Sequence, residues 1–139
     1  LFDLPHVVER ARGTFVAAGV DSRCSFVGGS FFEAVPVDAD AYLMRHIIHD
    51  WTDEQSQSIL QTVRRAIPAH GKLLVIETVI PPGNDPGFAK LLDLTMLVIP
   101  GGKERTEPEY RDLLAGAGFQ LTRIVPTAAD VHVIEAVPV

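Results

Sequence analysis

The run Leu73-Leu74-Val75-Ile76 constrains the possible fold of this chain more than any other feature. Four apolar residues follow one another without a polar interruption, between Lys72 and Glu77. A strand with one face in water alternates apolar and polar residues, whereas a strand covered on both faces is continuously apolar. We therefore expect a parallel sheet with helices on each side, in which residues 72–79 form an inner strand.

Further short apolar runs predict the rest of the sheet, at 25–28, 41–44, 119–125 and 131–137. A short polar stretch that includes Asp130 separates the last two, which are expected to pair as an antiparallel hairpin. The opening residues 1–5, Leu-Phe-Asp-Leu-Pro, have the pattern of a strand end and its exit turn. We expect on this basis that the chain is part of something longer.

Helices are expected between these strands. Thr52-Asp53-Glu54-Gln55 has the pattern of a capping box, and apolar residues recur behind it at helical spacing until Gly71. The same capping-box pattern occurs at Thr106-Glu107-Pro108-Glu109, before a second helix that ends at Gly118. Residues 88–98 form a third, apolar on more than one face and therefore expected to be buried. Alternating strands and helices predict an α/β fold.

Composition and charge argue against several classes of function. The 12 Lys and Arg residues are scattered among 18 Asp and Glu, for a net charge of −6, so no basic stripe favours nucleic acid. The single cysteine, Cys24, cannot form an internal disulfide, which suits a reducing compartment. No apolar run reaches the roughly 20 residues of a membrane span, and we expect no signal peptide before the domain. We expect a soluble cytoplasmic protein with no membrane partner.

Polar residues stand where the expected strands end, which is where ligands bind in open α/β sheets. They are Asp3, Gly29 with Ser30, residues 45–50, and Glu77. The set suits a nucleoside-like ligand. Asp3 can accept hydrogen bonds from ribose hydroxyls, or it can simply form a turn before Leu4 and Pro5.

The densest polar cluster is His46-Ile47-Ile48-His49-Asp50-Trp51. His49 can serve as a general base, because its reference pKa lies near neutrality. In two alternatives, His46, His49 and Asp50 bind a metal, or His49 has only a structural role. Glu77 ends an apolar strand and needs a partner if buried. Glu104 is either part of a site or pairs at the surface with Lys103 or Arg105.

Taken in order, five stretches of this chain closely resemble O-methyltransferases of the plant caffeic-acid and bacterial polyketide type. The group includes acetylserotonin and hydroxyneurosporene methyltransferases. The resemblance covers essentially the whole chain and is most specific at HDW and GGKERT; the stretches are Phe2–Pro5, Val27–Phe32, His49–Glu54, Ile76–Glu77 and Gly101–Thr106.

The resemblance implies a role for seven residues. His49 matches the catalytic base, and Glu77 and Glu104 match the catalytic acids that position it and the acceptor. For the cofactor S-adenosylmethionine, Asp3 would bind the ribose, Ser30 and Phe31 would lie by the adenine, and Arg45 would supply a basic contact. Two positions depart from the family pattern: Ser30 stands where Asp is usual, and Arg45 where plant relatives have Lys.

The resemblance also implies an architecture. We expect residues 1–139 to be the C-terminal part of a Rossmann-like class I methyltransferase domain, closed by the antiparallel hairpin. The family's first strand and glycine-rich loop would lie before Leu1, as would an N-terminal dimerisation region, and the full-length protein would be a homodimer. The missing strand would lie centrally, between the strand ending at Asp3 and the one ending near Arg45.

The implied reaction is transfer of a methyl group from S-adenosylmethionine to a hydroxyl of a small aromatic acceptor. Met96, Val98 and Ile99 are expected to face that acceptor. No metal is required, because the sulfonium already activates the methyl group. Two alternatives are a nicotinamide-dependent oxidoreductase, which also binds ribose through an acidic residue, and a non-catalytic module that binds S-adenosylmethionine.

Overall fold

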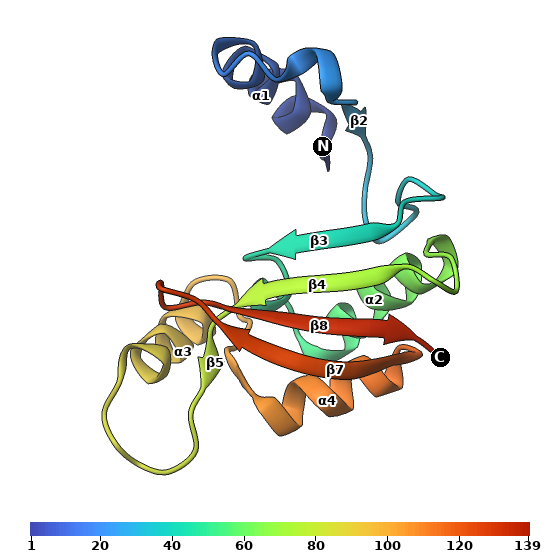
Figure 1. The fold of residues 1–139 in the computed structure, drawn as a ribbon. Coiled ribbons are helices and arrows are strands. Elements are labelled where there is room, and N and C mark those ends of the chain that lie inside the picture. The colour runs from blue at the N-terminus through green and yellow to red at the C-terminus, as the bar shows by residue number, and fades with distance from the viewer.

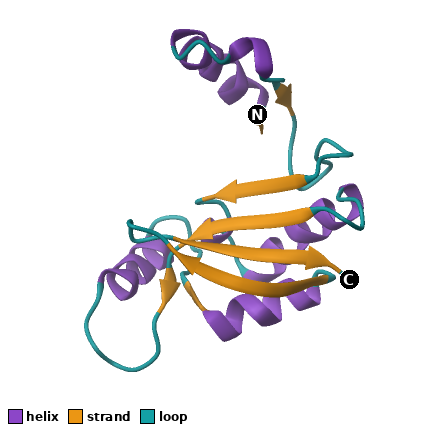
Figure 2. Ribbon diagram, in the orientation of Figure 1, coloured by secondary structure: helices purple, strands orange, loops and turns teal.

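The computed structural model describes residues 1–139 as a mixed α/β fold (Figures 1 and 2). Two 3-10 turns accompany the helices, η1 at Asp21–Arg23 and η2 at Ile48–Asp50. The helices are α1 (Pro5–Ala17), α2 (Asp53–Ala66), α3 (Phe88–Val98) and α4 (Glu107–Gly116). The strands are β1 (Phe2–Asp3), β2 (Val27–Gly28), β3 (Ala41–Arg45), β4 (Lys72–Glu77), β5 (Val79–Ile80), β6 (Arg105–Thr106), β7 (Phe119–Pro126) and β8 (His132–Pro138).

The main sheet has four strands in the order β3-β4-β8-β7. β3 and β4 run parallel, with Leu43 opposite Leu74, while β8 is antiparallel to both β4 and β7. The expected C-terminal hairpin is therefore confirmed. The strand predicted over 72–79 divides at Glu77, because β5 leaves the main sheet and pairs in parallel with β6.

Two amphipathic helices, α2 and α4, cover one face of this sheet (Figure 2). Both begin with the capping boxes that the sequence predicts, at Thr52 with Gln55 and at Thr106 with Glu109. Leu73 and Val75 point into the core, whereas Leu74 and Ile76 on the other face are only half-buried. The prediction that helices cover both faces of β4 is therefore wrong, because they cover only one face. The core comprises Ile48, Ile59, Leu60, Val63, Ile67, Leu73, Val75, Tyr110, Leu113, Leu114, Ala117, Phe119, Leu121, Ile134 and Ala136.

The N-terminal segment forms a separate small unit above β3 (Figure 1). β1 and β2 pair in parallel as a sheet of their own, with no hydrogen-bonded link to β3. A cavity of about 260 Å³ lies between β1 and β3, and residues of both strands line it. Sequence patterning did not predict α1: no side chain caps it at Leu4, and Val8 is its one buried residue.

Helix α3 differs from its prediction. Its apolar composition indicated a buried helix, but none of its residues is buried, and Leu91, Leu94 and Val98 are 66%, 60% and 81% exposed. The physical reason is that α3 lies at the side of the sheet, beyond the core that α2 and α4 build (Figure 1). None of the helices combines the length and hydrophobicity that a membrane span requires.

Candidate active site

Three acidic or basic side chains from distant parts of the sequence meet beside the end of β4. His49 lies on η2, the turn that follows β3, while Glu77 is the last residue of β4. Glu104 directly precedes β6. All three are buried, at 7%, 0% and 2% exposure. The structure therefore brings together the three residues that the resemblance assigns to catalysis.

The closest contact in this group joins His49 and Glu104. Nδ1 of His49 lies 2.7 Å from Oε1 of Glu104, a distance typical of a charge-assisted hydrogen bond. An ionised carboxylate can only accept, so Nδ1 carries the proton. In the neutral imidazole the other nitrogen, Nε2, then has the free lone pair. Nε2 faces Asp50, whose Oδ1 lies 3.5 Å away.

Glu77 fixes the backbone that carries His49. Its Oε1 accepts hydrogen bonds from the backbone N–H groups of Ile47 and Ile48, each at 2.9 Å. Its Oε2 points at the imidazoles and lies 3.5 Å from Nδ1 of His49. Oε1 of this buried acid thus has two backbone donors, whereas Oε2 accepts no hydrogen bond.

Burial and the neighbouring charges act in opposite directions on the pKa values of His49 and Glu77. Burial acts to lower the pKa of His49, but the hydrogen bond to Glu104 and the negative charges of Glu77, Glu104 and Asp50 outweigh it, and the pKa is raised. Burial raises the pKa of Glu77, although the charge of His49 and the backbone donors partly offset this effect. Both shifts follow from carboxylates and an imidazole sharing a space with little water.

The Gly101–Thr106 loop is held against the His49 segment by backbone contacts. Gly102 lies against the backbone of His49 and Asp50, where a Cβ atom would overlap the His49 carbonyl oxygen. That oxygen accepts a hydrogen bond from the Lys103 backbone N–H at 3.0 Å. Glycine at 102 is therefore required for Glu104 to reach His49.

The side chain of Arg105 also joins the Gly101–Thr106 loop to the His49 segment. It is fully buried and donates to the backbone oxygens of Ile48 and Trp51, at 3.2 and 3.1 Å. Two further bonds, from Nε and Nη2, reach Oδ1 of Asp53 at 3.0 and 2.8 Å. The interpretation of Glu104 as a surface partner of Lys103 or Arg105 is wrong, because both cations pair with Asp53 instead.

Sequence patterning missed two residues that support the site, Arg105 and Asp93. The carboxylate of Asp93 accepts a hydrogen bond from the Glu104 backbone N–H at 2.9 Å, which links α3 to the site. Asp93 is the one acidic residue in the largely apolar helix α3, and that was the available signal. Of the residues expected to face the acceptor, Met96 is half-buried, while Val98 and Ile99 are 81% and 76% exposed.

The four residues expected to hold the cofactor divide between two neighbouring hollows. Asp3, Phe31 and Arg45 line the cavity of about 260 Å³ between β1 and β3. Ser30 lines a hollow on the other side of Phe2, and its Oγ accepts a hydrogen bond from the Phe32 backbone N–H at 3.3 Å. The first three could together contact a nucleoside, through a carboxylate, an aromatic ring and a guanidinium.

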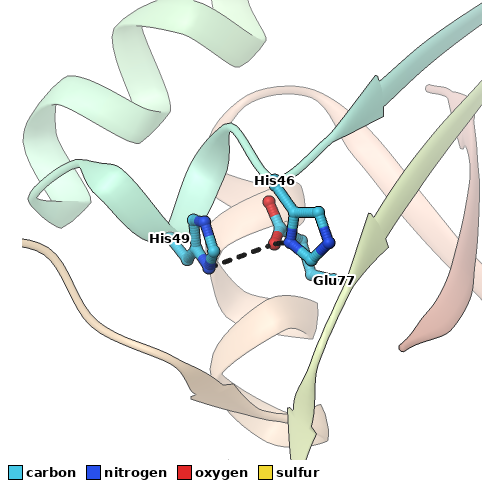
Figure 3. Close-up of side chains that lie close together, drawn as sticks. All are labelled: His46, His49 and Glu77. Carbon is cyan, nitrogen blue, oxygen red and sulfur yellow. Dashed lines mark ion pairs between the residues drawn. The ribbon is translucent and has the colours of Figure 1, made fainter. Parts of the chain in front are cut away.

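The metal alternative that the sequence left open involved His46, His49 and Asp50. The structure groups His46 and His49 with Glu77 instead (Figure 3), and ligand atoms of these three lie within 4.8 Å of one another. The grouping follows from the fold, because β4 runs beside β3 and delivers Glu77 to the turn that carries both histidines.

Comparison with known proteins places this chain in a family. Residues 1–120 match the model of the O-methyltransferase domain. The chain is 50% identical, over its whole length, to a phenazine O-methyltransferase of Lysobacter antibioticus. It is 43% identical, again over its whole length, to an O-demethylpuromycin O-methyltransferase of Streptomyces alboniger. The chain therefore belongs to the O-methyltransferase domain family.

Solved structures agree with this assignment. The crystal structure of LaPhzM superposes with a TM-score of 0.96 at 50% identity. CalO1, a methyltransferase of calicheamicin biosynthesis solved with S-adenosylhomocysteine, gives 0.91 at 40% identity, and both comparisons cover the whole chain. NcsB1 of neocarzinostatin biosynthesis, solved with S-adenosylmethionine and a hydroxynaphthoic acid, gives 0.88 at 33% identity over 99% of the chain.

The chain spans only part of these relatives. It covers 41% and 38% of the two curated proteins, and 42%, 41% and 40% of the three solved chains. The match confirms the class I methyltransferase fold that the sequence resemblance implied.

Proposed function

We propose that the protein transfers a methyl group from S-adenosylmethionine to a hydroxyl of a small aromatic molecule, with His49 as the general base. One observation carries the proposal: the 2.7 Å hydrogen bond from Nδ1 of His49 to Glu104. It holds the imidazole in the tautomer whose Nε2 can accept a proton. Named relatives act on phenazine, O-demethylpuromycin and caffeic acid, and they support an aromatic acceptor.

Bound S-adenosylmethionine supplies an activated methyl group. The acceptor oxygen must reach that group with its proton removed, because a phenol of pKa about 10 is poorly ionised at neutral pH. Nε2 of His49 would take this proton as the carbon–oxygen bond forms and the carbon–sulfur bond breaks, with S-adenosylhomocysteine as the leaving group, and Glu104 would stabilise the imidazolium that results. Glu77 holds the His49 backbone in place through Ile47 and Ile48.

The cofactor part of the proposal rests on the cavity between β1 and β3. Asp3 can accept from ribose hydroxyls, Phe31 offers a ring beside the adenine, and Arg45 offers a positive charge. Relatives solved with S-adenosylmethionine or S-adenosylhomocysteine support this choice of cofactor. Ser30 retains a hydroxyl next to this cavity where the family usually has Asp.

We further propose that residues 1–139 form the C-terminal part of the catalytic domain in a cytoplasmic homodimer. The coverage of about two fifths of the relatives supports the first point. The apolar residues that α3 exposes, among them Leu91, Leu94 and Val98, support a further covering element. In this proposal a strand from elsewhere in the protein pairs between β1 and β3.

The test uses the full-length protein and combines binding measurements with a turnover assay. Calorimetric titration should detect S-adenosylhomocysteine and no NAD, and labelled S-adenosylmethionine should methylate members of a panel of phenols. Binding of NAD instead would indicate the oxidoreductase alternative. Binding of S-adenosylhomocysteine without turnover on any phenol would indicate the non-catalytic module.

A further inference from the structure

His46 has no part in the proposed reaction, yet it completes a set of potential metal ligands. Nδ1 of His46 lies 3.7 Å from Oε2 of Glu77, and Nδ1 of His49 lies 3.5 Å from the same oxygen (Figure 3). Zinc binds such atoms at roughly 2.0–2.2 Å in a tetrahedron, which places neighbouring ligand atoms roughly 3.4 Å apart. The two separations from Oε2 of Glu77 are close to this value, and all three ligand atoms lie within 4.8 Å of one another.

Two carboxylate oxygens at this point lack a hydrogen-bond donor. Oε2 of Glu77 and Oε2 of Glu104 are buried without a partner, although their Oε1 atoms are bonded. Buried polar atoms are nearly always satisfied, and two carboxylate oxygens without a donor are costly to bury. A divalent cation between the imidazoles and the acids would supply the missing interaction.

The backbone of His46 is itself unusual. Its φ of 53° lies in the left-handed region, which residues other than glycine adopt uncommonly, asparagine, aspartate and histidine more often than the rest. This conformation sets the His46 ring beside that of His49, with centroids 5.2 Å apart. Such conformations gather at functional sites. The His46 side chain is 40% exposed, so an ion can approach it from solvent.

We propose that His46, His49 and Glu77 form an inhibitory zinc site, with Glu104 close enough to complete the coordination. The inhibition, though not the binding, rests on the proposed function. Zinc would replace the proton on Nδ1 of His49, as metals displace protons from their ligands. The neutral imidazole then keeps its proton on Nε2, and no lone pair remains to accept one from the acceptor. The ion therefore blocks turnover without being needed for it.

Binding is tested first, without substrates. Cobalt(II) added to the metal-free, full-length protein should give the visible absorption of a tetrahedral complex at one equivalent, and zinc should displace it. Absence of this spectrum overturns the site, whether or not the protein methylates phenols. A protein that shows the spectrum but methylates nothing retains the site and contradicts the proposed function.

His46→Asn is the variant that isolates the site, because asparagine tolerates the left-handed backbone but lacks the imidazole. We expect the zinc affinity of this variant to fall at least roughly tenfold. Its inhibition by zinc, measured relative to the metal-free rate of the same variant, should weaken by the same factor. His70→Asn is the matched control, since His70 is an exposed histidine paired with Asp40; it should behave as the parent does. Equal inhibition of the parent and His46→Asn would overturn the proposal, and the cobalt spectrum of the parent decides it if the variant does not fold.

Discussion

Gly102 packs directly against the carbonyl oxygen of His49, so closely that no side chain fits between them. The contact joins two loops that are far apart in the sequence, and it sets how near Glu104 comes to the imidazole. A hydrogen bond from Lys103 and the buried guanidinium of Arg105 hold the same two loops together. The site is therefore fixed by backbone contacts as much as by its acidic and basic side chains.

We expect Gly102→Ala to lower both stability and turnover. The added methyl group must displace the backbone of His49 and Asp50, and overpacking of this kind costs about 1–3 kcal/mol. Urea denaturation measures the free energy of unfolding, and a methyl-transfer assay measures the rate. Gly13→Ala is the matched control, because a Cβ at that helical position meets no atom within 4 Å. A Gly102→Ala protein with unchanged stability and rate would contradict the role given to this contact.

His49→Gln should nearly abolish turnover and leave cofactor affinity within a few fold. Loss of general-base catalysis typically reduces a rate by roughly 10²–10⁴, and His49 does not line the cavity assigned to the cofactor. Single-turnover kinetics and calorimetry with S-adenosylhomocysteine give the two quantities separately. His70→Gln, at an exposed site, serves as the control. If His49→Gln keeps more than half of the activity at neutral pH, His49 is not the base.

Glu77→Gln and Glu104→Gln should each lower the maximal rate more than they weaken cofactor binding. The amide retains the size of the acid but removes the negative charge that supports the imidazolium of His49. Rates and cofactor affinities are compared with thermal unfolding of the same variants. A variant that is less stable but has unchanged specific activity would identify its glutamate as structural.

Asp53 should contribute to stability in a manner that depends on pH. Burial acts to raise the pKa of Asp53, but hydrogen bonds from Lys103 and Arg105 outweigh it and hold the pKa below the ordinary value of 3.8. The folded state thus binds the proton less readily than the unfolded chain does. The contribution is complete above the unfolded pKa and is lost as the pH falls through the lower, folded value.

Urea denaturation of Asp53→Asn and the parent between pH 7 and pH 3 measures this effect. The parent should be the more stable at neutral pH, and the difference should shrink below about pH 4. Asp85→Asn is the control, because Asp85 is exposed, and Lys103 and Arg105 pair with Asp53 instead. A difference that stays constant down to pH 3 would show that the charge of Asp53 does not support Arg105 and Lys103.

Residues 1–139 expressed alone should bind S-adenosylmethionine poorly. β1 belongs to a sheet separate from that of β3, and β3 forms an exposed edge of the main sheet, so the residues assigned to the cofactor stand on two sheets that no strand joins. Titration of the isolated chain is compared with titration of the full-length protein. Micromolar binding and normal turnover by the isolated chain would show that no further strand is needed.

Local sequence determined much of this protein. The capping boxes at Thr52 and Thr106 define where α2 and α4 begin, because the hydroxyl and the side chain three residues later satisfy each other's backbone donors. The apolar run before Glu77 forms β4, and the two runs around Asp130 form the hairpin. The family motifs also indicated which side chains belong to the candidate site.

The tertiary structure decided what those local patterns could not. Whether α3 is buried depends on what covers it, and the start of α1 is marked by Pro5 but by no side-chain cap. Glu104 meets His49 across 55 residues only because β6 pairs with β5 and Arg105 reaches back to the loop after β3. Hydrophobic periodicity reports on neighbours along one element, whereas such a contact depends on how separate elements pack. The sequence by itself thus determined α2, α4, β4, the C-terminal hairpin and the candidate residues His49, Glu77 and Glu104, whereas packing decided that these three side chains meet.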